Sequence, residues 1–278
     1  MLRTRVITAF VLLGLLLPSM FYLYQAHWAL LVAAFVGVGA WEWGALLRWN
    51  EIQRRLLGIF VALACAGVAL IAPDAIGASA IHEFGPVWVF AVYLIAAVFW
   101  CLLIPFWLRT RWALGTGAAG LLTGLVVLFP TWLALVQLRI PGPGILLALF
   151  AVVWMADVAA YFSGKAFGKH KLAPNISPGK TWEGALGAVV GVIVYGLVMR
   201  FATGYAPLAL PLWVMALVLV TAVSIIGDLY ESMLKRQAGI KDSSNVLPGH
   251  GGVLDRIDSL TSTMPIIALL WLVTQGIQ

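Results

Sequence analysis

Long apolar segments constrain the fold of this chain more than any other feature of its sequence. Hydrophobic residues make up 63% of the 278 positions and charged residues only 10%, whereas soluble domains carry about 25% charged residues. The mean hydropathy is +1.01. A water-soluble fold of this size could not bury so much apolar surface. We therefore predict an all-α polytopic integral membrane protein, because helices satisfy their own backbone hydrogen bonds inside a bilayer.

The apolar runs predict nine transmembrane helices and no soluble domain. A helix needs about 20 apolar residues to cross the hydrocarbon core. The predicted spans are 5–24, 27–47, 56–73, 87–108, 113–138, 143–163, 184–203, 207–227 and 259–277. The first follows the basic sequence MLRTR, as in a signal peptide, but it continues without a small-residue cleavage site, so we interpret it as an uncleaved span.

The basic residues predict the orientation of the chain. With the N-terminus in the cytoplasm, all 17 Lys and Arg residues except Arg139 and Arg200 lie on the cytoplasmic side, as the positive-inside rule expects. The pI of about 9.6 then reflects membrane topology rather than nucleic-acid binding. The polar loops 164–183 and 228–258 fall on the same side, where they can meet.

We predict that residues 1–140 form a transmembrane scaffold and that residues 141–278 form the catalytic region.

The first region contains few candidates for chemistry. Cys65 and Cys101 lie in apolar runs and behave as small hydrophobic residues, so neither a disulfide nor a cysteine metal site is expected. The glycines of the fifth span predict close helix packing; they are Gly115, Gly117, Gly120 and Gly124. Glu42 is open to two interpretations, namely a buried carboxylate with a helix partner or a group that handles substrate or protons.

The scarce charges gather in residues 224–259, which hold five of the eleven acidic residues. Such a polar cluster beside apolar spans indicates a functional site. If the eighth helix continues beyond the bilayer, Asp228, Glu231, Ser232, Lys235 and Arg236 share one face until Gly239 ends it. For Glu231, an ordinary surface ion pair is an equally good interpretation.

Three aspartates in this stretch predict a divalent-cation site. Asp255 and Asp258 are three residues apart where the ninth span begins, so they project the same way, with Asp228 opposite. Mg²⁺ is typically held by one or two carboxylates together with substrate phosphates. The alternative is that these aspartates merely favour the positive end of the helix dipole.

The segment 177–181 predicts an anion site. We expect Ser177 to cap the following helix, with Pro178 in its first turn. Backbone N–H groups, Lys180 and Thr181 would then bind phosphate at the helix N-terminus. The neighbouring cations from Lys165 to Lys171 suit attachment to anionic lipid headgroups equally well.

Two motifs carry a resemblance to a known family. The longer one is Ser232-x-Leu234-Lys235-Arg236, Lys241-Asp242, and then Leu247-Pro248-x-His250-Gly251-Gly252-Val253-x-Asp255-Arg256-Ile257-Asp258. The shorter is Asp157-x-x-Ala160-Tyr161-x-x-Gly164 with Ser177-Pro178-x-Lys180-Thr181-x-Glu183-Gly184. The chain resembles the phosphatidate cytidylyltransferases (CDP-diacylglycerol synthases) over its C-terminal half. Gly179 stands where another Lys is often expected.

The resemblance implies that CTP and phosphatidate give CDP-diacylglycerol and pyrophosphate, with Mg²⁺ and a monovalent cation such as K⁺ as cofactors. It implies phospholipid biosynthesis at a bacterial inner membrane, a site facing the cytoplasm and no nucleic-acid partner, with a homodimer left open. The implied catalytic residues are Asp228, Lys235, Arg236, Asp255, Arg256 and Asp258, with metal at the three aspartates. The implied substrate-binding residues are Asp157, Ser177, Lys180, Thr181, Ser232, Lys241, His250, Gly251 and Gly252, where His250 could instead only fix its turn.

Two other functions compete with this interpretation. A CTP-dependent lipid kinase would use similar groups but release CDP instead of pyrophosphate. A cation-coupled transporter would use in-membrane acids such as Glu42 and Asp157 near the bilayer midplane. The gathering of acids at one membrane face argues against the transporter.

Overall fold

The computed structural model describes residues 2–78, 86–205 and 207–275. Within these ranges, nine helices are long and apolar enough to cross a membrane. This confirms the predicted all-α polytopic architecture. His82 and most of the segment 74–86, which connects the third and fourth predicted spans, lie outside the described residues.

Each predicted span corresponds to one long helix or to one interrupted helix. The uninterrupted helices are α1 Leu2–Tyr22, α2 Gln25–Leu46, α3 Glu51–Ile71, α6 Ala118–Gln137, α7 Pro143–Phe167, α8 Trp182–Thr203, α9 Leu210–Ala238 and α10 Leu254–Gln275. The fourth span combines α4 Val87–Val98, the π-helical turn η2 Phe99–Leu103 and α5 Ile104–Thr110. The remaining elements are the 3₁₀ turn η1 Pro73–Ile76 and the strands β1 Lys171–Ala173 and β2 Ser177–Thr181.

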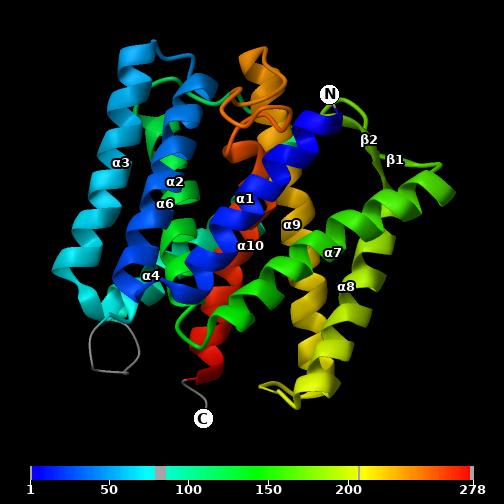
Figure 1. Cartoon of the computed structure of the whole chain (residues 1–278). Coiled ribbons are helices and arrows are strands. Elements are labelled where there is room, and N and C mark those ends of the chain that lie inside the picture. The colour runs from blue at the N-terminus through cyan, green and yellow to red at the C-terminus, as the bar shows by residue number, and fades with distance from the viewer. Residues whose placement is uncertain (1, 79–85, 206, 276–278) are drawn as a thin grey trace.

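The helices form two groups that share α9 and α10. Figure 1 shows α2, α3, α4 and α6 on one side, α7 and α8 on the other, and α1 slanting across the bundle. The first group is held by buried tryptophans that donate to backbone carbonyls of the facing helix, with Trp28 Nε1 3.1 Å from Leu135 O and Trp132 Nε1 3.0 Å from Ala29 O. A smaller apolar cluster joins α7, α8 and α9.

Glycines allow close helix packing in both groups. A Cβ added at Gly124 would overlap Trp43 of α2, and one at Gly120 would overlap Leu47, which directly follows α2; this confirms their predicted packing role. Gly115 and Gly117 precede α6, so their placement in a packed helix was wrong. In the second group, a Cβ at Gly187 of α8 would overlap Ser163 of α7.

The start of α8 differs from the prediction. Ser177 does not cap this helix, because it begins β2, which pairs antiparallel with β1. Thr181 is the cap instead, since its Oγ1 accepts a hydrogen bond of 3.1 Å from Gly184 N. The strand pairing satisfies backbone groups of 177–181 that a helix start would have left free.

The polar segments gather at one end of the bundle. Figure 1 places the N-terminus, the β1–β2 hairpin and the loop between α9 and α10 together there. Thr8 Oγ1 of α1 donates a hydrogen bond of 2.9 Å to Pro248 O in that loop. Helix α9 continues to Ala238 and ends at Gly239, whose φ of 77° lies in the left-handed region, as predicted.

Candidate active site

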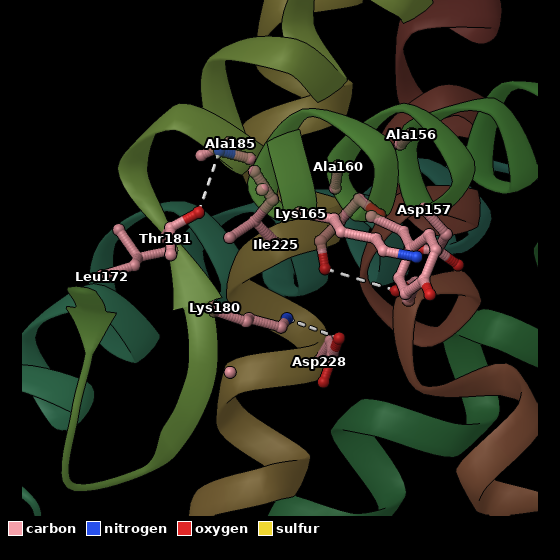
Figure 2. A pocket seen from close by; sticks show the side chains of 16 residues that line it. Ala156, Asp157, Ala160, Lys165, Leu172, Lys180, Thr181, Ala185, Ile225 and Asp228 are labelled. Carbon is pink, nitrogen blue, oxygen red and sulfur yellow. Dashed lines mark hydrogen bonds and ion pairs between the residues drawn. The ribbon is translucent and has the colours of Figure 1, made fainter. Parts of the chain in front are cut away.

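A cavity of about 470 Å³ lies between α7, β2, α8 and α9 at the polar end of the bundle. Polar side chains of α7, β2 and α9 line this cavity, together with Ser259 of α10. Figure 2 shows Asp157 and Lys165 projecting from α7 on one side, with Lys180 of β2 and Asp228 of α9 opposite. The apolar lining includes Ala156, Ala160 and Ile225. The cavity therefore combines charged and apolar lining.

Lys180 and Asp228 form an ion pair across this cavity, which links the β hairpin to α9 (Figure 2). The other oxygen of Asp228 accepts a hydrogen bond of 3.2 Å from Ser232 Oγ, one turn further along α9. Both groups of the Lys180–Asp228 pair keep about a quarter of their side-chain surface exposed, at 25% and 30%. They are thus accessible to a ligand, and the pair could exchange partners with it.

Three carboxylates come together near this point. Asp228 lies close enough to Asp157 and to Asp258 to repel both electrostatically. Gly227 permits the approach of α9 to α10, because an added Cβ would overlap Ser262 and lie 2.9 Å from Asp258 O. Lys180 and Arg256 partly offset the negative charge at Asp157. This arrangement favours a bound cation.

Asp255 is bound by groups of the protein itself. Its Oδ1 is 2.6 Å from Lys235 Nζ, which also lies 3.0 Å from Glu231 Oε1. Its Oδ2 accepts hydrogen bonds of 2.8 Å from Ser243 N and Gly252 N, and it lies 2.9 Å from Ser243 Oγ, whose one proton it shares with Glu42. Both carboxylate oxygens are therefore occupied by protein donors.

The grouping of Asp228, Asp255 and Asp258 around one ion stays a prediction. Asp258 is close enough to interact electrostatically with both Asp228 and Lys235, while Asp255 already has protein donors at both oxygens. Within the three described ranges, no three His, Cys, Asp or Glu side chains converge closely enough to hold a metal ion alone. The residues fit an ion that shares one or two carboxylates with substrate phosphates. Asp228 and Asp258, with Asp157 beside them, are the carboxylates placed for that role.

Glu231 is buried, with 5% of its surface exposed, so the interpretation as a surface ion pair was wrong. The continuous α9 places Glu231 and Lys235 one turn apart, as expected, but this face is turned toward α10. A buried ion pair is costly unless its members are well bonded. Lys235 bridges Glu231 and Asp255, but among the described residues neither oxygen of Glu231 accepts a hydrogen bond, so the condition is met for Asp255 and only by charge for Glu231.

Glu42 is fully buried, as the first of its two interpretations expected. Its partners are not on a neighbouring helix face, however, but in the loop before α10. Glu42 accepts hydrogen bonds from the hydroxyls of Ser243 and Ser244 and from the backbone N–H groups of Val253 and Leu254. The sequence indicates Glu42 only as an acidic residue inside an apolar span. No feature of the sequence near Glu42 indicates that its partners lie in residues 243–254.

The glycines of the Pro248–Gly252 turn make room for the protein's own carboxylates. Gly251 has a φ of 83°, and a Cβ there would lie 2.6 Å from Asp255 Oδ2. A Cβ at Gly252 would overlap Glu42 and Ser243. His250 donates its backbone N–H to Leu247 O at 2.8 Å, and within the described residues its buried Nδ1 has no hydrogen-bond partner.

Several other predicted site residues do not line the cavity. Arg236, Lys241 and Arg256 are exposed, and none forms an ion pair with another described residue. Ser177 does not line the cavity, whereas Gly179, Lys180 and Thr181 do. Tyr161 and Lys165 line it as well, although neither was among the predicted site residues.

Comparison with known proteins extends the resemblance to the whole chain. Residues 3–274 match the Cytidylyltransferase family. A phosphatidate cytidylyltransferase of Pseudomonas aeruginosa is 44% identical over 98% of this chain and 97% of its own length. One from Haemophilus influenzae is 34% identical over 98% of this chain and 99% of its own length. A third, from Brucella suis, is 51% identical over 121 residues, 44% of each chain.

These matches include the first four spans, for which the sequence motifs gave no information. They also cover both the elements that form the cavity and the helix that carries Glu42. The chain therefore belongs to the cytidylyltransferase family.

Proposed function

We propose that this chain transfers CMP from CTP to phosphatidate, giving CDP-diacylglycerol and pyrophosphate. The observation that carries the proposal is the cavity that the shorter family motif lines together with α9. Ala156, Ala160 and Ile225 contribute apolar lining, which suits a lipid. Lys180 and Asp228 contribute charged lining, which suits phosphate groups. The relatives named phosphatidate cytidylyltransferase support the same substrates.

The reaction needs positioning and charge neutralisation more than proton transfer. An oxygen of the phosphatidate phosphate attacks the α-phosphorus of CTP, and the bond to the departing pyrophosphate breaks in line. A phosphate monoester is already largely ionised near neutral pH, so no strong general base is required. Lys165 and Lys180 would neutralise phosphate charge inside the cavity, and the exposed Arg236, Lys241 and Arg256 would do so outside its lining.

A divalent cation would be held by Asp228 and Asp258, with Asp157 beside them. The fit rests on electrostatics, because two anionic substrates must enter a cavity that already has converging carboxylates. Mg²⁺ bound there would neutralise the charge that develops on the phosphates. Asp255 would act by holding Lys235 in place. K⁺ remains our proposal for a second cation.

We also propose that the protein lies in a bacterial inner membrane with the cavity facing the cytoplasm. The 15 Lys and Arg residues assigned to one side support this orientation, as does the gathering of polar loops at one end of the bundle (Figure 1).

The test uses purified protein in detergent with phosphatidate, CTP and Mg²⁺, and follows pyrophosphate and the lipid product together. We expect CDP-diacylglycerol with equimolar pyrophosphate, lost with EDTA and restored by Mg²⁺. Release of CDP and phosphorylation of diacylglycerol in a parallel reaction would instead show a lipid kinase. No turnover of either lipid by folded protein would contradict both enzymes and favour the transporter.

A further inference from the structure

We propose that Glu42 is a positioning residue for the transfer reaction, although it lies outside both family motifs. It acts by fixing the loop 243–254 and the start of α10 relative to α2. The expected effect of Glu42 on kcat rests on the proposed function. Its effect on the loop 243–254 can be tested without substrate.

Glu42 occupies an unusual position for an anion. It lies in the apolar helix α2 and has no exposed surface, and no Lys, Arg or His of the described residues forms an ion pair with it. A buried charge of this kind is costly unless donors surround it. All four of its donors come from one distant segment, about 200 residues further along the chain.

The four hydrogen bonds are divided evenly between the two oxygens. Oε1 accepts from Ser244 Oγ at 2.5 Å and from Val253 N at 2.9 Å. Oε2 accepts from Ser243 Oγ at 3.1 Å and from Leu254 N at 2.6 Å. Each oxygen thus holds one serine hydroxyl and one backbone N–H group.

The backbone contacts set the beginning of α10. The first N–H groups of a helix have no partner within the helix and carry its positive dipole end. Glu42 binds the N–H group of Leu254, the first residue of α10, and that of Val253 just before it. Asp255 follows in the first turn and Asp258 comes one turn later, so fixing the start of α10 also sets where their carboxylates lie.

The serine contacts connect Glu42 to the Lys235 cluster. Ser243 Oγ lies within hydrogen-bonding distance of both Glu42 Oε2 and Asp255 Oδ2. Asp255 in turn holds Lys235. Gly252 has no space for a side chain between these carboxylates. Glu42 is therefore linked, through one loop, to the start of the helix that carries Asp258.

The decisive variant is Glu42→Gln, which keeps the shape and removes the charge. A glutamine has one accepting oxygen and one NH₂ group that can only donate. Because each oxygen of Glu42 faces a backbone N–H group, the NH₂ group meets a donor in either orientation. Glu51→Gln is the matched control, since Glu51 lies on the same end of the protein but pairs with Arg54 and Arg55 at the surface.

The experiment measures kcat and KM for both substrates per folded molecule, together with hydrogen–deuterium exchange without substrate. We expect Glu42→Gln to lower kcat by about 100-fold through misplaced groups, with both KM values changed far less. Exchange should become faster in residues 243–254 but not in α3 or α8. Glu51→Gln should match the wild type in both measurements.

Wild-type kcat in folded Glu42→Gln would overturn the inference, as would faster exchange throughout the protein with unchanged kcat. If Glu42→Gln does not fold, Ser244→Ala replaces it, because it removes one donor and leaves the carboxylate. We then expect a smaller fall in kcat and faster exchange in the same loop, and wild-type values would overturn the inference. If the wild type itself makes no CDP-diacylglycerol, the proposed function fails, and the exchange measurement alone decides whether Glu42 fixes the loop.

Discussion

Lys235 Nζ lies 2.6 Å from Asp255 Oδ1 and so joins α9 to the first turn of α10. The same ammonium group lies 3.0 Å from Glu231 Oε1, within its own helix. All three side chains are largely buried, with 12%, 4% and 6% of their side-chain surface exposed. One cation thus compensates two buried carboxylates, and this relationship governs how the site responds to mutation.

Replacing Lys235 should destabilise the protein as well as inactivate it. Lys235→Ala leaves Glu231 and Asp255 buried without a counter-charge, which typically costs about 3–5 kcal/mol. We expect a lower thermal unfolding midpoint in detergent and no measurable turnover. The matched variant is Arg236→Ala, since Arg236 is the adjacent exposed cation; it should weaken substrate binding at unchanged stability. Equal unfolding midpoints for the two variants would contradict the buried cluster.

Asp255 and Asp258 should differ when each is changed to asparagine. Asp255→Asn places an NH₂ group against Lys235 or against the two backbone N–H donors at Oδ2, so it should cost about 1–3 kcal/mol of stability along with activity. Asp258→Asn should lose activity by about 100-fold or more while its unfolding midpoint stays near that of the wild type. Thermal unfolding and CDP-diacylglycerol formation measure the two effects. Wild-type stability in Asp255→Asn would show that its hydrogen bonds contribute little.

Gly252→Ala tests the close approach of the loop to Glu42. The added methyl group would overlap Glu42 and Ser243, and such overpacking typically costs about 1–3 kcal/mol. We expect reduced activity and a lower unfolding midpoint. Gly144→Ala is the control, because a Cβ there meets no atom within 4 Å. An active, stable Gly252→Ala protein would mean that this loop adapts easily.

The orientation can be tested with single cysteines in a protein lacking Cys65 and Cys101. Val246→Cys lies at the polar end and Tyr205→Cys at the opposite end, and the native side chains are 47% and 46% exposed. In intact cells whose outer membrane admits the reagent, a maleimide that cannot cross the inner membrane should label Tyr205→Cys only. Val246→Cys should react after the inner membrane is permeabilised. The reverse pattern would invert the proposed topology.

The sequence alone was sufficient for the architecture, because hydropathy is a local property. A run of about 20 apolar residues must cross the bilayer or be buried, so nine runs predicted nine helices. The same locality explains why Gly239 could be identified as the end of α9 and why residues 224–259 stood out. The fold of residues 177–181 was missed, since Ser-Pro suits a helix start as well as a strand, and only pairing with Lys171–Ala173 decides between them.

The tertiary structure alone decided which charges act together. The i, i+3 spacing of Asp255 and Asp258 shows that they share a helix face, but it does not show which partner each one meets. Because α9 packs against α10, Asp255 forms an ion pair with Lys235 and Asp258 lies near Asp228. Glu42 finds its donors across about 200 residues of chain because α2 packs beside the loop. The partner of a buried charge is set by helices that meet in space, and local spacing in the sequence does not encode that meeting.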